Sequence, residues 1–142
     1  MNAASNTLTV LGVTITTNSD TEFEDKSSQQ LRLFNLSDLH MNDYVEARGA
    51  PAQSGGLNAS TLVRDRPENY SYLQGTATNV ASPNLTVLGF MVATSLATQF
   101  SGPDGSTLSA AAFFSQAPNQ TVKVRGTLFS GVFTADRAQI EQ

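Results

Sequence analysis

The chain has 142 residues, a net charge of −4 and only 14% charged residues. Neither half carries the basic stripe that a nucleic-acid backbone requires, so nucleic-acid binding is disfavoured. The absence of cysteine excludes a disulfide framework and a thiolate metal site. No apolar run approaches the eighteen or so residues of a membrane-spanning helix.

The first elements are short strands. Residues Leu8–Thr16 alternate around Gly12, which predicts two strands joined by a tight turn that needs glycine. Thr21–Phe23 predicts a third strand with its phenylalanine in the core. Leu36–Met41 then predicts a single helical turn, with Ser37 as its N-terminal cap.

Two longer strands follow in this half of the chain. Tyr44–Gly49 alternates between apolar and charged residues, which is typical of a half-buried strand. Pro51–Gly56 predicts a turn, and Leu57–Arg64 predicts the closing strand. The next segment, Arg66–Asn69, reads as a short boundary between two modules.

The second half repeats this pattern after one additional strand. The predicted segments are a strand at Tyr72–Thr78, a hairpin turning at Gly89, a strand at Thr98–Phe100, a polar connector at Gly102–Thr107, an apolar segment at Ala110–Phe114, and strands at Thr121–Gly126 and Val132–Glu141 around the turn Ser130–Gly131.

An internal repeat accounts for this similarity. Asn2–Gly49 aligns with Asn79–Gly126 without a gap, and sixteen of forty-eight pairs are identical. We therefore expect two modules, residues 1–66 and 67–142. The counterpart of the strand Tyr72–Thr78 would precede residue 1, so we expect the first module to lack its N-terminal strand and to have an open sheet edge.

The pattern predicts an all-β chain. About six short strands and at most one helical turn occur in each module, and a small antiparallel sheet commonly removes its edges by closing on itself. We therefore expect two tandem small antiparallel β-barrels of the OB-like type.

Several short motifs resemble a bacterial family, the tandem modules of domain of unknown function 5666. They are Thr9–Gly12, Phe23–Glu24, Asn42–Gly49 and Ala138–Glu141. The second copy has Asn119–Gln120 where this family has Gly-Asp, which predicts a different turn there. The resemblance implies an exported bacterial protein or lipoprotein, located in the periplasm or outside the cell, with no defined catalytic residue.

Two groups of residues are candidate metal sites. His40 is the only histidine, and with Asp38 and Asp43 it falls short of the usual zinc ligand set, so a polar surface role is favoured. A second group is acidic and offers the oxygen ligands that calcium prefers, although a solvated strand face with Glu22 and Glu24 opposite Phe23 is favoured. This acidic group is Asp20, Glu22, Glu24 and Asp25.

Two further groups are candidate binding residues. Arg48 and Arg125 occupy equivalent positions before a glycine, where an ion pair across strands or between modules is favoured over an anion site. An aromatic group near the boundary and the last hairpin is expected to lie mostly in the core or between modules, although its exposure would create a binding patch. It consists of Tyr70, Tyr72, Phe129 and Phe133.

The sequence favours a non-catalytic repeat module of an exported bacterial protein, acting in protein binding, glycan binding or as a structural spacer. The alternative is an OB-like domain that binds oligosaccharides or oligonucleotides. No catalytic, cofactor-binding or metal-binding residue is predicted. The expected partners are a protein or a glycan, with no nucleic acid, and the chain is expected to be a monomer or a weak oligomer through its open edge strand.

Overall fold

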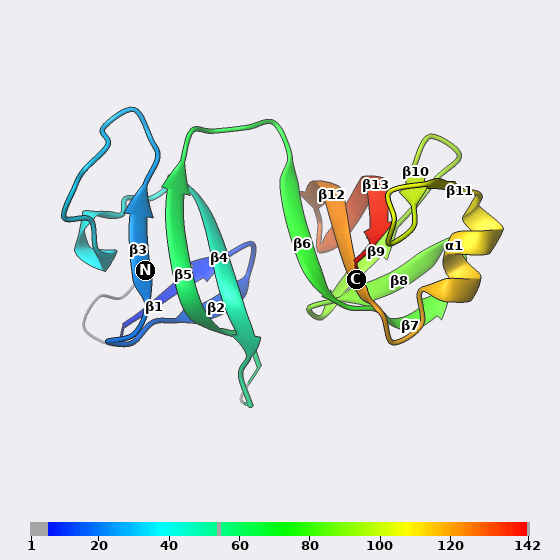
Figure 1. The fold of residues 1–142 in the computed structure, drawn as a ribbon, viewed down its shortest axis with the longest axis horizontal. Helices are drawn as coiled ribbons and strands as arrows, with labels where there is room; N and C mark the ends of the chain where they lie inside the picture. The colour runs from blue at the N-terminus through cyan, green and yellow to red at the C-terminus, as the bar shows by residue number, and fades with distance from the viewer. Residues whose placement is uncertain (1–5, 54, 142) are drawn as a thin grey trace. The chain divides into compact units, whose positions relative to one another are not determined.

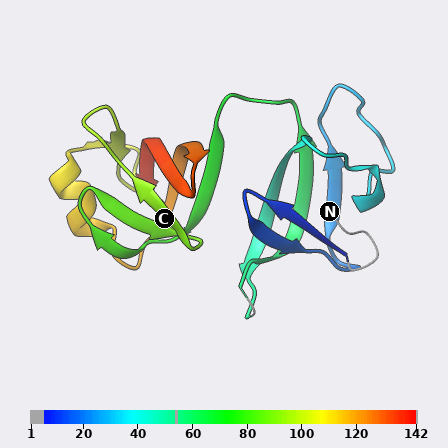
Figure 2. The ribbon, with the colours of Figure 1, turned by 180° about the vertical axis from the view of Figure 1, so that it is seen from behind.

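A computed structural model describes residues 6–53 and 55–141. The chain divides into two compact units, Met1–Glu68 and Asn69–Gln142, each with its own sheet (Figures 1 and 2). The boundary predicted from the sequence lay after residue 66. The repeat pairs at Asn2, Ala4 and Ser5 lie outside the described residues.

The first unit is built around one long strand. Its elements are β1 (Thr7–Val10), β2 (Val13–Thr16), β3 (Glu22–Asp25), the 3₁₀ helix η2 (Leu36–Asp38), β4 (Tyr44–Pro51) and β5 (Leu57–Asp65). β4 pairs with β5 along one edge in antiparallel fashion, while β2 and β3 pair in parallel with successive parts of β5. The β1–β2 hairpin, blue in Figure 2, extends this sheet.

The second unit repeats this arrangement and adds strands. Its elements are β6 (Ser71–Thr76), β7 (Thr78–Ala81), β8 (Asn84–Val87), β9 (Phe90–Ala93), β10 (Gln99–Ser101), β11 (Thr107–Leu108), α1 (Ala110–Gln116), β12 (Thr121–Phe129) and β13 (Val132–Ile140). β13 takes the place of β5: it pairs with β12 in antiparallel fashion and with β9 and β10 in parallel. β6 pairs with β12 and β7 pairs with β8.

The predicted all-β class is confirmed, and several details are corrected. The sheets are mixed rather than antiparallel. β2 and β3 each pair in parallel with β5, and β9 and β10 each pair in parallel with β13. The described residues form five strands in the first unit and eight in the second, not about six in each. The helix α1 has seven residues, more than the single predicted turn.

The Leu-Gly pairs shared by both copies form equivalent hairpin turns. Leu11 and Gly12 have φ angles of 53° and 83°, and Leu88 and Gly89 have 52° and 81°. Positive φ at both central residues is the type I′ turn, whose twist matches that of the strands it joins. The prediction of tight turns at both glycines is confirmed.

The shared Arg-Gly pairs lie opposite a bulge, at which the facing strand carries one extra residue, Ser60 in β5 and Asp136 in β13. The register of β4 against β5 shifts between Arg48 and Gly49, and that of β12 against β13 shifts between Arg125 and Gly126. A Cβ added at either glycine would lie 1.9 Å from a carbonyl oxygen of the facing strand, which leaves room for glycine alone. The Arg-Gly motif is therefore part of the scaffold.

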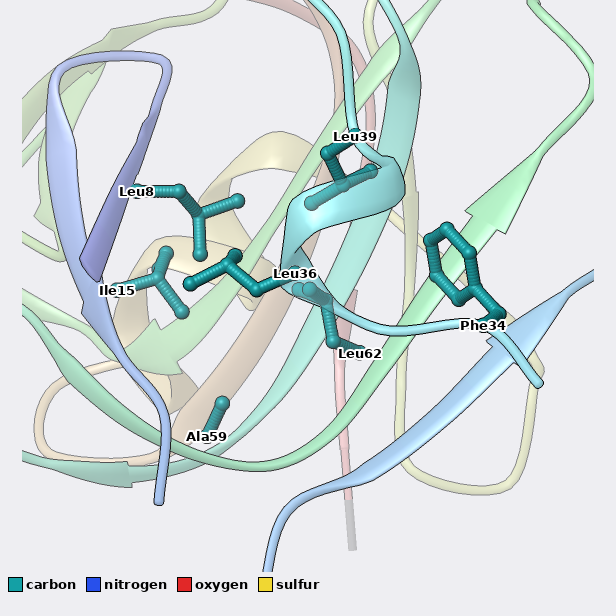
Figure 3. Close-up of a cluster of buried hydrophobic side chains, with 7 residues drawn as sticks. All are labelled: Leu8, Ile15, Phe34, Leu36, Leu39, Ala59 and Leu62. Carbon is teal, nitrogen blue, oxygen red and sulfur yellow. The ribbon is translucent and has the colours of Figure 1, made fainter. Parts of the chain in front are cut away.

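The core of the first unit lies between the β1–β2 hairpin and η2. Leu8 and Ile15 of the hairpin face Leu36 of η2, with Leu62 of β5 nearby (Figure 3). Phe34, Leu39 and Ala59 complete the cluster. In the second unit the matching place is taken by α1, which lies beside β10 and β11 in Figure 1 and buries Phe113 against Phe100, with ring centroids 4.8 Å apart.

Two local predictions are wrong. Asn35, not Ser37, caps η2: its side chain accepts a hydrogen bond from the Ser37 N–H, while Asp38 accepts one from the Asn35 N–H. The turn at Asn119 also matches its counterpart, since Asn119 and Asn42 have φ angles of 64° and 71°. Asparagine adopts the left-handed region more readily than most residues that carry a side chain.

Candidate functional site

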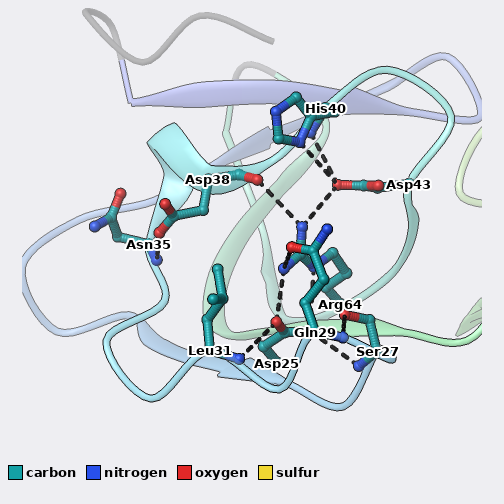
Figure 4. A network of polar contacts seen from close by, with 9 residues as sticks. All are labelled: Asp25, Ser27, Gln29, Leu31, Asn35, Asp38, His40, Asp43 and Arg64. Carbon is teal, nitrogen blue, oxygen red and sulfur yellow. Dashed lines mark hydrogen bonds and ion pairs between the residues drawn. The ribbon is translucent and has the colours of Figure 1, made fainter.

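A buried polar network lies in the first unit, centred on Arg64 of β5 (Figure 4). The guanidinium binds Asp25 through two bonds, Nε to Oδ1 at 3.1 Å and Nη2 to Oδ2 at 2.6 Å. It also donates to Gln29 Oε1, to the Asp38 carbonyl and to Asp43 Oδ2. All five of its N–H groups are thereby used, so the guanidinium has none left for a ligand.

Burial and charge make this network structural. The side chain of Arg64 is 3% exposed and that of Asp25 is fully buried. The Arg64 guanidinium holds the pKa of Asp25 well below its usual range, and Asp25 in turn raises the pKa of Arg64, because each charge stabilises the other. The Asp25 carboxylate also accepts the N–H groups of Ser27 and Leu31, which fastens the connector after β3 to the sheet.

The candidate metal ligands do not converge. Asp38 caps η2, and Asp43 accepts bonds from Arg64 and from the His40 N–H, while the His40 side chain is largely exposed with Nδ1 4.0 Å from Asp43. Within residues 6–53 and 55–141, no three acidic or histidine side chains form a metal-binding group. The predicted strand face is confirmed for Glu22 and Glu24, which are exposed on either side of the partly buried Phe23, and Asp20 is exposed in the preceding turn. The prediction is wrong for Asp25, which was grouped with them and is fully buried.

A second polar site lies on the outward face of the second unit, where β6, β12, β13 and β10 run side by side. Strand pairing sets its side chains in two rows, because residues that face each other across two strands share a sheet face. We call this surface the outer face. Its first row is Tyr72, Arg125, Arg137 and Gln99, and its second row is Gln74, Lys123, Gln139 and Ser101. Most of these side chains line an open depression of about 680 Å³.

The cations of the outer face differ in their surroundings. Arg125 binds Asp136 through two bonds of 2.9 and 2.7 Å and lies 4.2 Å above the Tyr70 ring. This pairing raises the pKa of Arg125 and lowers that of Asp136, as opposite charges do to one another. Among the described residues, no carboxylate forms an ion pair with Lys123 or Arg137, and Arg137 acts on Asp136 only through its charge, which helps to lower the pKa of that carboxyl.

An exposed ring accompanies these charges. Tyr72 is 43% exposed, and the Lys123 ammonium lies 5.1 Å from its centroid. The ring can stack, the cation can pair with a negative charge, and the neighbouring amide and hydroxyl groups can form hydrogen bonds. All of these groups lie on one surface. Each of these contacts is chemically suited to a polar anionic group.

The equivalent face of the first unit has the opposite charge. There Glu46 takes the place of Lys123, Thr61 that of Arg137, and Glu22 that of Gln99. Lys26 and Arg48 lie nearby, paired with Glu24 and Glu46. The two equivalent faces therefore differ in charge, since carboxylates of the first unit stand where the second unit has Lys123 and Gln99.

Several of these residues were identified from the sequence. The ion pair predicted for Arg125 is confirmed across strands, while Arg48 pairs within its own strand with Glu46. Phe133 lies in the core as expected, whereas Tyr70, Tyr72 and Phe129 are 40%, 43% and 80% exposed.

Other residues were missed. Lys123, Arg64 and Arg137 were not singled out. The partner of Arg64, Asp25, lies on a strand distant in sequence, and Arg137 comes beside Arg125 only through the pairing of β12 with β13. The alternation of Val122, Lys123, Val124 and Arg125 was the one signal that placed two cations on a single face.

Comparisons with known proteins agree with the internal repeat. The family model described as "Domain of unknown function (DUF5666)" matches the chain twice, over residues 1–62 and 74–139. Neither the curated proteins nor the solved structures gave a match. Among the described residues, no helix is long and apolar enough to cross a membrane.

Proposed function

Because the chain belongs to the family of domain of unknown function 5666, in two consecutive copies, we propose that it is a non-catalytic binding module of an exported bacterial protein, and that its second unit binds an acidic glycan on the outer face. The observation that carries this proposal is the pair Lys123 and Arg137, two cations without an ion-pair partner in the described part of the chain, beside the exposed ring of Tyr72. A periplasmic or extracellular location follows from the family resemblance.

The chemistry of the outer face supports a sugar acid as the ligand. A uronic acid presents a carboxylate, several hydroxyls and an apolar ring face. Lys123 and Arg137 match the carboxylate, Gln99 and Gln139 match the hydroxyls, and Tyr72 matches the ring face. The depression is open and spans both strand rows, which suits a chain of sugars better than a single small molecule.

A non-catalytic role is supported by the titratable groups. Catalytic acids and bases carry pKa values shifted toward the working pH. Asp25, Asp104 and Asp136 instead have pKa values shifted downward by hydrogen bonds or ion pairs with protein groups. Groups held in this way serve as fixed charges.

An OB-like barrel remains the proposed architecture of the second unit. β12 pairs with β13, β13 with β9, β9 with β8, and β8 with β7. β6, which directly precedes β7 in the chain, pairs with β12. A sheet that returns to its first strand has the connectivity of a small barrel. The first unit follows the same path from β4 through β5 and β2 to β1.

The alternative ligand of such a barrel is an oligonucleotide. OB-type barrels hold nucleic acids on their second and third strands, which correspond here to β8 and β9. Those strands read Asn-Leu-Thr-Val and Phe-Met-Val-Ala, without a basic residue. The described lysine and arginine side chains of the second unit lie instead on β12 and β13, so this observation favours the glycan.

Calorimetric titration of the full chain with an oligogalacturonate tests the proposal. We expect saturable binding that weakens about threefold or more in Lys123→Gln and in Arg137→Gln, and further at high salt. Arg66→Gln, an exposed cation of the first unit, is the matched control and should bind as the unaltered chain does. A neutral dextran of equal length should not bind.

Three results would contradict the proposal. Equal binding by the control and both variants would remove the outer face from consideration. Tighter binding of single-stranded DNA than of oligogalacturonate would favour the oligonucleotide alternative. Absence of binding to either ligand would favour the spacer role.

A further inference from the structure

The second unit pairs a strand, β6, with an edge whose counterpart in the described part of the first unit has no such strand. β6 pairs with β12 in antiparallel fashion, with Leu73 opposite Val124 and Gly75 opposite Val122. β12 corresponds to β4 by the internal repeat. Among the residues that the structure describes, β4 pairs with β5 alone.

Backbone hydrogen bonds show which residues of β12 direct their N–H and C=O groups toward β6. The Glu141 N–H donates to the Thr121 carbonyl, so Thr121 faces β13, whereas the Ala77 N–H donates to the Gln120 carbonyl. Successive residues of a strand direct their backbone groups to opposite sides. The N–H and C=O groups of Val122 and Val124 therefore face β6.

The same argument fixes the edge of β4. The Lys26 N–H donates to the Arg64 carbonyl, so Arg64 faces β3 and its neighbours in β5 face β4. Because Val63 faces β4, its pairing partner Glu46 faces β5. The N–H and C=O groups of Val45 and Ala47 consequently point away from β5, at the outer edge of the sheet.

Side-chain burial agrees with this difference. Val122 and Val124 are completely buried, and Leu73 of β6 is 5% exposed beside them. Their counterparts Val45 and Ala47 pack only partly against the core of the first unit. An apolar side chain at the place of Leu73 would bury both.

We propose that the β4 edge binds a β6-type strand from a further module of this family, which completes the first sheet by antiparallel pairing with Val45 and Ala47. This strand is extended and uncharged, with an apolar residue opposite Ala47 and glycine opposite Val45. Glycine fits best there because a Cβ at Gly75 would lie 3.1 Å from the side chain of Leu88, whose counterpart Leu11 forms the same turn. The inference does not depend on the glycan proposal.

Amide hydrogen exchange on the full chain tests the proposal with an internal control. In the free chain, the amides of Val45 and Ala47 should exchange rapidly, while those of Val122 and Val124 should be protected. A synthetic peptide with the sequence of residues 69–78 should bind once per chain. It should slow exchange at Val45 and Ala47 by about tenfold or more and leave Val122 and Val124 unchanged.

Peptide variants separate strand pairing from general adhesion. In β6, the amides of Leu73 and Gly75 face the partner strand, while that of Gln74 faces away, since successive residues alternate. N-methylation at Leu73 and Gly75 should abolish binding, and N-methylation at Gln74 should preserve it. Joining the same sequence directly before residue 1 raises its effective concentration and should give full protection even if the separate peptide binds weakly.

The proposal is overturned if neither the peptide nor the joined strand protects Val45 and Ala47. It is also overturned if these amides are already as protected as Val122 and Val124 in the free monomer. Protection that increases with chain concentration, together with a dimer in sedimentation, would assign the edge to a second copy instead.

Discussion

Arg64 binds both carboxylate oxygens of Asp25, whereas the equivalent positions of the second unit hold Ile140 and Gly102. Two copies of one module therefore fasten the connector after the third strand by different means. The first uses a buried ion pair, and the second packs Phe113 and Phe114 of α1 on Phe100. The repeat preserves the scaffold while its polar contacts have diverged.

Replacing Arg64 by leucine leaves a buried carboxylate without its cation. Breaking a buried ion pair in this way costs about 3 kcal/mol of unfolding free energy. The double variant Asp25→Leu/Arg64→Leu should be more stable than the sum of the single effects predicts, because neither charge is then left alone. Urea unfolding of the four proteins measures this coupling.

The exposed pair of Arg48 and Glu46 serves as the control for this cycle. Its side chains are 71% and 49% exposed. Arg48→Leu should therefore change the free energy of unfolding by about 0.5 kcal/mol or less. A coupling for Arg64 and Asp25 no larger than that of the exposed pair would show that the buried network does not stabilise the unit.

Acid should weaken the first unit through Asp25. Its pKa is lower in the folded chain than in the unfolded chain, where an aspartate titrates at about 3.9. The contribution of Asp25 is therefore fully present above that value and is lost as the pH falls below it toward the folded pKa. Thermal unfolding between neutral and strongly acidic pH should show a smaller decline for Asp25→Asn than for the unaltered chain; parallel declines would contradict this assignment.

The bulge glycines should not tolerate a side chain. In Gly126→Ala the new Cβ would lie 1.9 Å from the Thr134 carbonyl oxygen, so the two strands must separate. This separation should cost about 3 kcal/mol. Gly89→Ala meets no atom within 4 Å and suffers only from its φ of +81°. That backbone strain costs about 1 kcal/mol. Urea unfolding midpoints compare the variants, and equal losses would refute a steric origin.

One threonine in each copy, Thr21 before β3 and Thr98 before β10, also belongs to the scaffold. The Thr98 hydroxyl donates to the buried Ala135 carbonyl and accepts the Ser95 N–H, as Thr21 does with Ala59 and Asn18. Thr98→Val should lower stability by about 1–2 kcal/mol, because it leaves that carbonyl unsatisfied. Thr127→Val, at an exposed position of β12, should have little effect by the same measurement.

Much of the strand and turn pattern could be predicted from the sequence, because it depends on residues that are neighbours along the chain. The turn at Gly12, the alternation from Tyr44 to Gly49 and the internal repeat each depend on neighbours along the chain or on direct comparison of the copies, and each agrees with the structure. The parallel pairing of β3 with β5 joins segments far apart in the chain and left no periodic signal. For the same reason the Arg64–Asp25 pair was missed, and Asp25 was grouped with Glu22 and Glu24.

The candidate site was predictable only in part. Strand alternation placed Lys123 and Arg125 outward, and Tyr72 was recognised as a residue whose exposure would matter. The position of Arg137 beside them depends on the bulge at Arg125, which changes the pairing of β12 with β13. Such a bulge shows in sequence only as a glycine within a strand.

The proposed binding surface is the outer face of the second unit and not its acidic counterpart in the first. Chemical-shift mapping of the full chain during titration with oligogalacturonate distinguishes the two surfaces. The resonances of Tyr72, Lys123, Arg137 and Gln139 should shift, and those of Glu22, Glu46 and Thr61 should not. Shifts confined to the first unit, or to β8 and β9 of the second, would contradict this proposal.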